Sequence, residues 1–219
     1  MPRLLFEKKG NAIWISHLDL MRLFQRAFNR AGLLLTHTQG FNPRPSVSIA
    51  LPLSVGIESR CELLDFHLDG EPVSNEEILT RLNDTLVDGV RVLAVYDDGQ
   101  KIKNIAYLDC TLVLEYDRGV PSGAAAALAE LFGRESVIVT KKSKNGMMEQ
   151  NIIPMIRSIK TAQTDDNTLT VQARICCQNP SLNPMQLCSA IESHSPSLSP
   201  DFAKCRREEV YDYQENIFR

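Results

Sequence analysis

The order of expected strands and helices constrains the fold of this 219-residue chain more than any other feature. In the first half, alternating apolar runs that predict strands and apolar repeats of helical period follow one another as strand, helix, strands, helix, strand. The expected strands are residues 3–15 (a strand, or a hairpin turning near residue 10), 33–38, 46–53, 61–68 and 90–96. This order predicts the split βαβ arrangement of a ferredoxin-like unit, with two helices on one face of an antiparallel sheet.

The two helices of the first half have clear start and end signals. Ser16 and Ser74 are each followed three residues later by an acidic residue, which is a capping-box pattern. Gly32 and Gly89 stand where a left-handed residue would end each helix.

The second half repeats this order of elements without repeating the sequence. The expected strands are 107–116, 136–140, 147–153, 169–176 and 210–213, the expected helices are 124–132 and 183–191, and a basic turn is expected at 141–146. A polar break at 97–100 separates the halves. We therefore predict an α+β protein of two tandem ferredoxin-like (split βαβ) units with antiparallel sheets, at residues 1–98 and 105–219.

Charge is distributed unevenly along the chain. The net charge is −3, which excludes a protein that is basic overall. Residues 1–60 nevertheless carry eight Lys and Arg against three acids, so a local basic face on an acidic body is expected. Residues 1–15 lack the apolar core of a secretory leader, and no apolar run reaches the roughly 18 residues of a membrane span. A cytoplasmic location without a membrane partner is expected.

Three arginines form a row on the first helix. Arg22, Arg26 and Arg30 are four residues apart and therefore share one helix face. Helix propensity does not require them, since Lys, Gln or Glu would serve equally well. One interpretation is an anion-binding surface that contacts phosphate, to which Arg is well suited. The other is a solvated face whose arginines pair with acids elsewhere in the chain.

The loop that follows, GFNPRP at 40–45, is unusual in composition. Its two prolines remove backbone donors and favour an extended, stiff chain. Phe41, Asn42 and Arg44 offer a stacking ring, an amide and a guanidinium, which suit unpaired bases. The alternative interpretation is a structural crossover with Phe41 in the core.

Catalytic and metal-binding patterns are sparse. His17, at the start of the first helix, and His37, at the entrance to the loop, are candidates for the general base and acid of a metal-independent ribonuclease. Four histidines and six cysteines show no paired ligand spacing, so neither a metal site nor a cofactor is predicted.

The motifs SHLDLMR at 16–22 and GFNPRP at 40–45 resemble those of the radical-SAM-linked domain of unknown function found in bacteria and some archaea. The resemblance covers nearly the whole chain, and one departure is Arg44, where that family often has His. It implies a role beside a radical SAM enzyme in RNA modification. The chain lacks the three-cysteine CxxxCxxC pattern that ligates a radical SAM cluster, so it is not itself that enzyme.

Three functions follow from these observations. The preferred hypothesis is an RNA-binding or substrate-presenting accessory module that is not catalytic by itself. The alternatives are the His17/His37 ribonuclease and a protein-interaction module that docks a radical SAM enzyme.

Overall fold

The computed structural model describes residues 2–143 and 146–219. The chain divides into two compact units, one of Met1–Ile102 with Arg219 and one of Lys103–Phe218. The unit bounds expected from the sequence, 1–98 and 105–219, stay a prediction.

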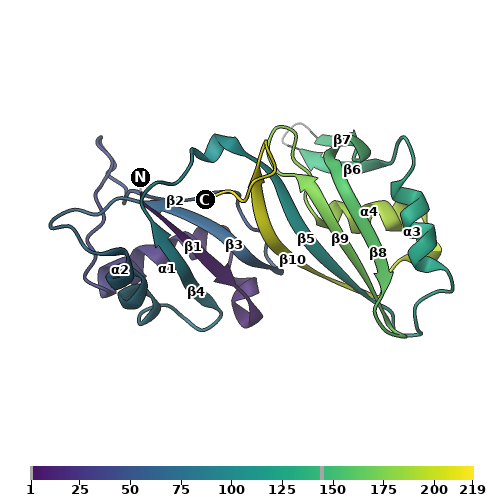
Figure 1. Ribbon diagram of the computed structural model, residues 1–219, viewed down its shortest axis with the longest axis horizontal. Helices are drawn as coiled ribbons and strands as arrows, with labels where there is room; N and C mark the ends of the chain where they lie inside the picture. The colour runs from purple at the N-terminus through teal and green to yellow at the C-terminus, as the bar shows by residue number, and fades with distance from the viewer. Residues whose placement is uncertain (1, 144–145) are drawn as a thin grey trace. The chain divides into compact units, whose positions relative to one another are not determined.

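The first unit follows the order strand, helix, two strands, helix, strand (Figure 1). Its elements are β1 (Arg3–Lys8), α1 (His17–Arg30), β2 (Val47–Ile49), β3 (Ile57–Phe66), α2 (Asn75–Asn83) and β4 (Val90–Tyr96), with a short 3-10 helix, η1 (Gly10–Trp14), after β1. The strands pair antiparallel in the order β4-β1-β3-β2.

Both helices of this unit cover the same face of its sheet. Alternate strand residues and the apolar stripes of α1 and α2 form one buried cluster, which includes Leu4, Phe6, Leu64, Phe66 and Val92 of the strands with Leu20, Phe24, Phe28, Ile78 and Leu82 of the helices. The rings of Phe6 and Phe24 meet edge to face at 4.7 Å. The sequence predicted the bounds of β4, the edge strand of this sheet.

Of three further strand expectations in the first unit, two are confirmed only in part and one is wrong. Of the strand or hairpin expected at 3–15, only β1 forms. The buried ammonium of Lys8 binds the carbonyls of Ile13 (3.1 Å) and Ile15 (2.7 Å) and holds the next segment as η1. The expected strand at 33–38 makes only isolated bridges. The strand at 46–53 shortens to β2, since Leu51 has a φ of 47°, outside the β region.

The second helix also ends earlier than Gly89. The side chain of Asn83, the last residue of α2, accepts a hydrogen bond from the Val92 N–H (2.9 Å) and donates one to its carbonyl (3.0 Å). This pair of bonds ties the end of α2 to β4 and leaves residues 84–89 as the connection.

The second unit contains β5 (Ile105–Glu115), α3 (Ala124–Phe132), β6 (Ile138–Ser143), β7 (Gly146–Asn151), β8 (Ile156–Gln163), β9 (Thr168–Cys176), α4 (Met185–His194) and β10 (Phe202–Asp212). Its main sheet is antiparallel in the order β10-β5-β9-β8, and β6 and β7 form a separate hairpin. Apart from that hairpin, element order and strand order repeat those of the first unit. The tip of the expected basic turn, Lys144 and Asn145, lies outside the described residues.

Sequence patterns predicted the bounds of α3 and nearly those of β9, but missed β8 and most of β10. β8 (IRSIKTAQ) is a polar edge strand with weak alternation. In β10, a bulge between Arg207 and Glu209 shifts the register and breaks the period-two pattern. The described residues thus form a mixed α/β protein with antiparallel sheets and four α-helices. None of those helices is long and apolar enough to cross a membrane.

Candidate nucleic-acid interface

Helix α1 begins and ends as its sequence predicts. The Ser16 hydroxyl accepts a hydrogen bond from the Asp19 N–H (3.2 Å), and Gly32 follows the helix with a φ of 69°. Because the apolar stripe faces the core, the opposite face presents Arg22, Arg26 and Arg30 to solvent.

The three arginines differ in their partners. Arg22 donates to Asp19 (2.9 Å), which lies one turn earlier, and hydrogen bonds from Ser16 and Arg22 lower the pKa of that carboxyl. Arg30 donates to the Thr85 carbonyl beyond the end of α2 (2.7 Å). Arg26 makes no hydrogen bond or ion pair with any described residue. The row is therefore not a fully paired face.

One buried acid of the first unit, on β3, pairs with β1 and not with the arginines of α1. Asp65 of β3 is buried and binds Arg3 of β1 through both carboxylate oxygens, at 2.5 and 3.2 Å. Arg3 also donates to the Gln100 carbonyl (2.7 Å). The ion pair joins β1 to β3, and the bond to Gln100 joins β1 to the segment that follows β4.

The 36–46 loop projects from the first unit on a hydrogen-bonded stem. Thr38 N–H donates to the Arg44 carbonyl (2.9 Å), Arg44 N–H donates to the Thr38 hydroxyl (3.0 Å), and Ser46 N–H donates to the Thr36 carbonyl (2.7 Å). Gly40 turns the tip with a φ of 137°. The stem holds residues 39–43 away from the core.

Phe41 lies at this tip with a relative exposure of 107%. The interpretation of the loop as a crossover with Phe41 in the core is therefore wrong. Asn42 and Arg44 are also exposed, and their side chains contact no partner within the described part of the chain.

The two candidate catalytic histidines occupy separate elements. His17 is the first residue of α1, and its Nδ1 is buried without a hydrogen bond. His37 is exposed on the loop stem, where it bridges Pro45. No hydrogen bond within residues 2–143 and 146–219 joins the two imidazoles. Over the same ranges, no group of three or more His, Cys, Asp and Glu is arranged to hold a metal ion.

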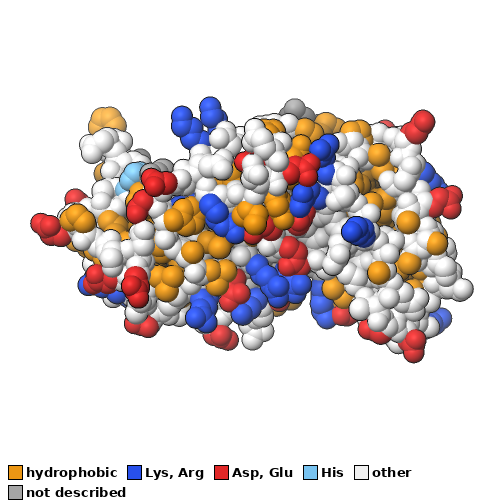
Figure 2. All heavy atoms as spheres, viewed as in Figure 1, with side chains coloured by type: hydrophobic (Ala, Val, Ile, Leu, Met, Phe, Trp, Pro, Cys, Tyr) orange, Lys and Arg blue, Asp and Glu red, His pale blue; other side chains and the backbone are white. Residues whose placement is uncertain are grey.

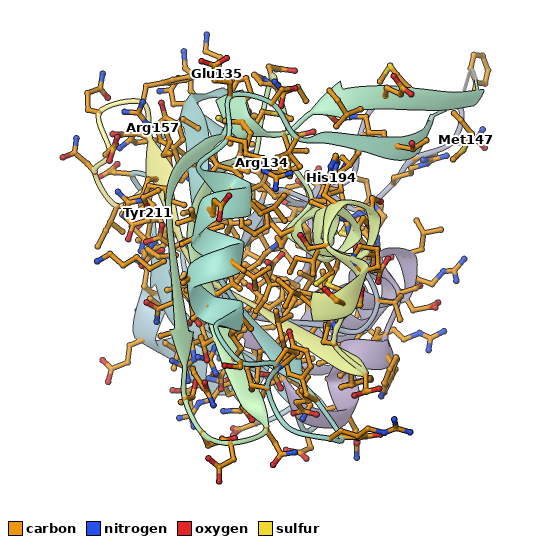
Figure 3. All side chains as sticks on the ribbon, turned by 90° about the vertical axis from the view of Figure 1, so that its right-hand side faces the viewer. Arg134, Glu135, Met147, Arg157, His194 and Tyr211 are labelled. Carbon is orange, nitrogen blue, oxygen red and sulfur yellow. The ribbon has the colours of Figure 1, made fainter. Side chains whose placement is uncertain are left out.

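Sequence reasoning missed a charged cluster on the second unit. On the sheet face away from α3 and α4, Arg174 binds Asp109 with two hydrogen bonds (2.7 and 2.9 Å), and Glu215 accepts from both Arg174 (2.9 Å) and Arg157 (2.8 Å). Arg174 also stacks on the Tyr211 ring at 3.9 Å. Figure 3 shows Arg157 and Tyr211 on the same side of the sheet. These residues lie far apart in the sequence and meet through the pairing of their strands, so no sequence spacing predicts the cluster.

Charges of both signs are mixed over the surface. On the face drawn in Figure 2, Lys and Arg side chains are interspersed with Asp and Glu. Hydrogen bonds from Arg157 and then Arg174 lower the pKa of Glu215, and the bond with Asp109 raises the pKa of Arg174. Many surface cations are thus held by acids of the same chain. A cation such as Arg26, with no hydrogen bond or ion pair to a described residue, is a better candidate for binding an external anion.

These features define an α+β protein of two units, the first of which carries both an exposed aromatic loop and an arginine-bearing helix. The chain belongs to a family described as "Uncharacterized protein conserved in bacteria (DUF2344)", whose model matches residues 2–184. That description names no radical SAM protein. No curated protein matches the chain.

The solved structures that match the chain share little sequence identity with it. A chain of the crystal structure of a Cbf5-Nop10-Gar1 complex has 7% identity and a TM-score of 0.50, over 95% of this chain and 48% of that one. A chain of an H/ACA RNP bound to a substrate RNA containing 2′-deoxyuridine has 7% identity and a TM-score of 0.47 (94% and 46%). An unknown protein from Galdieria sulphuraria has 8% identity and a TM-score of 0.27 (94% and 96%). The chain spans about half the length of the first two, and its similarity to the first concerns the fold alone.

Proposed function

We propose that this protein is an RNA-binding accessory module, not catalytic by itself, whose first unit holds unpaired bases with the 36–46 loop and phosphates with α1. The observation that carries the proposal is Phe41, a wholly exposed ring at the tip of a hydrogen-bonded stem. A ring in this position contributes nothing to the core and is available for stacking.

The loop tip combines the groups that recognise single-stranded RNA. Stacking of a base on an aromatic side chain contributes about 1–3 kcal/mol and tolerates any base. Asn42 and Arg44 flank Phe41 with exposed side chains that have no partner in the described ranges, so they can bond to base edges. Duplex RNA would not offer its faces to this ring, and unpaired RNA is the substrate class that the tip fits.

Helix α1 adds the phosphate contacts. Arg26 makes no hydrogen bond or ion pair with a described residue, whereas Arg22 and Arg30 each use part of their guanidinium on protein groups. A guanidinium retains further donors after one hydrogen bond, so all three can contact phosphate, with Arg26 contributing most.

The finer architecture and the partner are parts of the same proposal. The order βαββαβ and the strand order of each sheet support two tandem ferredoxin-like units, at residues 1–98 and 105–219. The resemblance carried by the SHLDLMR and GFNPRP motifs implies a cytoplasmic radical SAM enzyme as the partner that modifies the bound RNA.

The test is a fluorescence-anisotropy titration of the nuclease-treated full chain with a short single-stranded RNA and with the duplex of the same sequence. We expect the single strand to bind more tightly and its affinity to fall with salt. Absence of RNA binding at low salt would overturn the proposal. A nuclease-insensitive protein partner that is lost in Arg26→Glu would then assign the arginine row to protein docking.

A further inference from the structure

The second unit has a groove on the sheet face away from its helices. Its volume is about 480 Å³, and its lining includes Asp109, Thr111, Lys160, Gln172, Arg174 and Arg206. Thr161, next to Lys160 on β8, faces the opposite way and donates to the Ala125 carbonyl of α3. Since side chains alternate along a strand, Lys160 points away from α3 and into the groove.

One cross-strand row of four side chains spans this groove. Lys160 lies opposite Gln172, Gln172 opposite Thr111, and Thr111 opposite Arg206. Neighbouring strands are about 4.8 Å apart, so the backbones of the two cations are about 14 Å apart. Their long side chains can reach toward each other over Gln172 and Thr111, which places two cations and two neutral polar groups along one line.

The acids of the groove are neutralised by arginines, and the row keeps spare donors. Arg174 uses Nε and Nη2 on Asp109 and Nη1 on Glu215. Arg206 donates Nε to Glu208 (2.8 Å), and its Nη groups make no hydrogen bond within the described ranges. Lys160 has no hydrogen bond or ion pair to any residue that the structure describes.

We propose that this groove binds a phosphate ester. Lys160 and the Nη groups of Arg206 hold the phosphate oxygens, while the Gln172 amide and the Thr111 hydroxyl donate from below. A phosphate ester offers several acceptor oxygens, which match the Lys160 ammonium, the Nη donors of Arg206 and the two neutral donors better than a single carboxylate does. The volume suits an organic ester rather than inorganic phosphate, because sites for such ligands measure about 300–1,000 Å³.

A free nucleotide and an RNA phosphodiester share this chemistry. The proposal does not rest on the function proposed for the first unit, because its residues lie on β5, β8, β9 and β10. Arg26→Ala would leave this site intact, so the two proposals fail separately.

The experiment is isothermal titration calorimetry of the full chain, at low salt, with adenosine 5′-monophosphate, a single-stranded RNA hexamer and succinate. To exclude the first unit as the source of hexamer binding, all proteins carry Arg26→Ala and Phe41→Ala. We expect the monophosphate or the hexamer to bind, and Lys160→Gln and Arg206→Gln each to weaken that binding about tenfold or more. Whichever ester binds identifies the source.

The matched control is Lys204→Gln. Lys204 lies on the same face of β10 two residues before Arg206, but it pairs with Glu115 and does not line the groove. We expect the Lys204→Gln protein to bind the esters as tightly as the background protein does. Lys160 is exposed, so Lys160→Gln should retain the unfolding temperature, which circular dichroism checks. Three results would overturn the proposal: no binding of either ester, equal binding of succinate, or equal losses in Lys160→Gln and Lys204→Gln.

Discussion

The three arginines of α1 should separate in their effects when each is replaced by alanine. Arg26 has no partner among the described residues, Arg22 pairs with Asp19, and Arg30 binds the Thr85 carbonyl. Arg26→Ala should therefore affect RNA binding without affecting folding, whereas Arg30→Ala should affect both.

The magnitudes follow from these contacts. Arg26→Ala leaves the free energy of unfolding within about 0.5 kcal/mol of the parent, as for other exposed substitutions that break no contact. Loss of its phosphate contact weakens single-stranded RNA binding about fivefold and reduces the slope of log K against log salt by about 0.7. Arg30→Ala lowers the free energy of unfolding by about 0.5–1.5 kcal/mol, because the Thr85 carbonyl loses a hydrogen bond. Arg22→Ala changes stability little, since its ion pair is exposed.

The assay combines urea unfolding of each variant with anisotropy titrations at several salt concentrations. A change in unfolding midpoint for Arg26→Ala as large as that for Arg30→Ala would refute the difference in partners. An unchanged salt slope in Arg26→Ala would refute its contact with phosphate.

The remaining predictions concern stability and reactivity. Asp65→Ala leaves a buried guanidinium on β1 without its carboxylate and should lower the free energy of unfolding by about 3–5 kcal/mol. Urea titrations measure this loss, and an effect below about 1 kcal/mol would contradict the buried ion pair. Glu215 has its pKa lowered by hydrogen bonds from Arg157 and Arg174, so its stabilisation is complete above its ordinary pKa of 4.5 and is lost as pH falls through the lower folded value. Thermal melts should therefore show Glu215→Gln less stable than the parent above pH 4.5 and converging with it in acid; a constant difference across this range would refute the linkage. Burial raises the pKa of Cys205 to about 12, so the folded protein should not react with iodoacetamide at this thiol at pH 8. Peptide mapping should find Cys205 alkylated only after urea is added, and rapid reaction of the folded protein would contradict its burial.

Elements with strong local signals were predictable from sequence. The start of α1 and of α2 was predicted to within one or two residues from the caps at Ser16 and Ser74. Both ends of α3 and of β9 were predicted as closely from their apolar patterns. β8 was missed because an edge strand needs little apolar patterning. The end of α2 was missed because Asn83 finds its partner on β4, nine residues later.

The candidate interface was predictable in part. Helical spacing alone places the three arginines on an exposed face, and the structure has them there. Their unequal partners depend on tertiary contacts, since Thr85 lies 55 residues after Arg30. The exposure of Phe41 was one of two open interpretations, because a phenylalanine in a proline-rich loop can pack inward as easily as outward. The groove of the second unit depends on strand register, which no local pattern specifies.

The most direct test of the proposed function compares the single-stranded RNA affinity of Phe41→Ala with that of Tyr213→Ala. Tyr213 is also exposed (57%) but follows β10 in the second unit. If Phe41 stacks on a base, Phe41→Ala should weaken RNA binding about 5- to 150-fold, the equivalent of about 1–3 kcal/mol. The unfolding temperature of Phe41→Ala should stay unchanged, and Tyr213→Ala should bind RNA like the parent. Equal affinity of Phe41→Ala and the parent would contradict the proposed role of the loop.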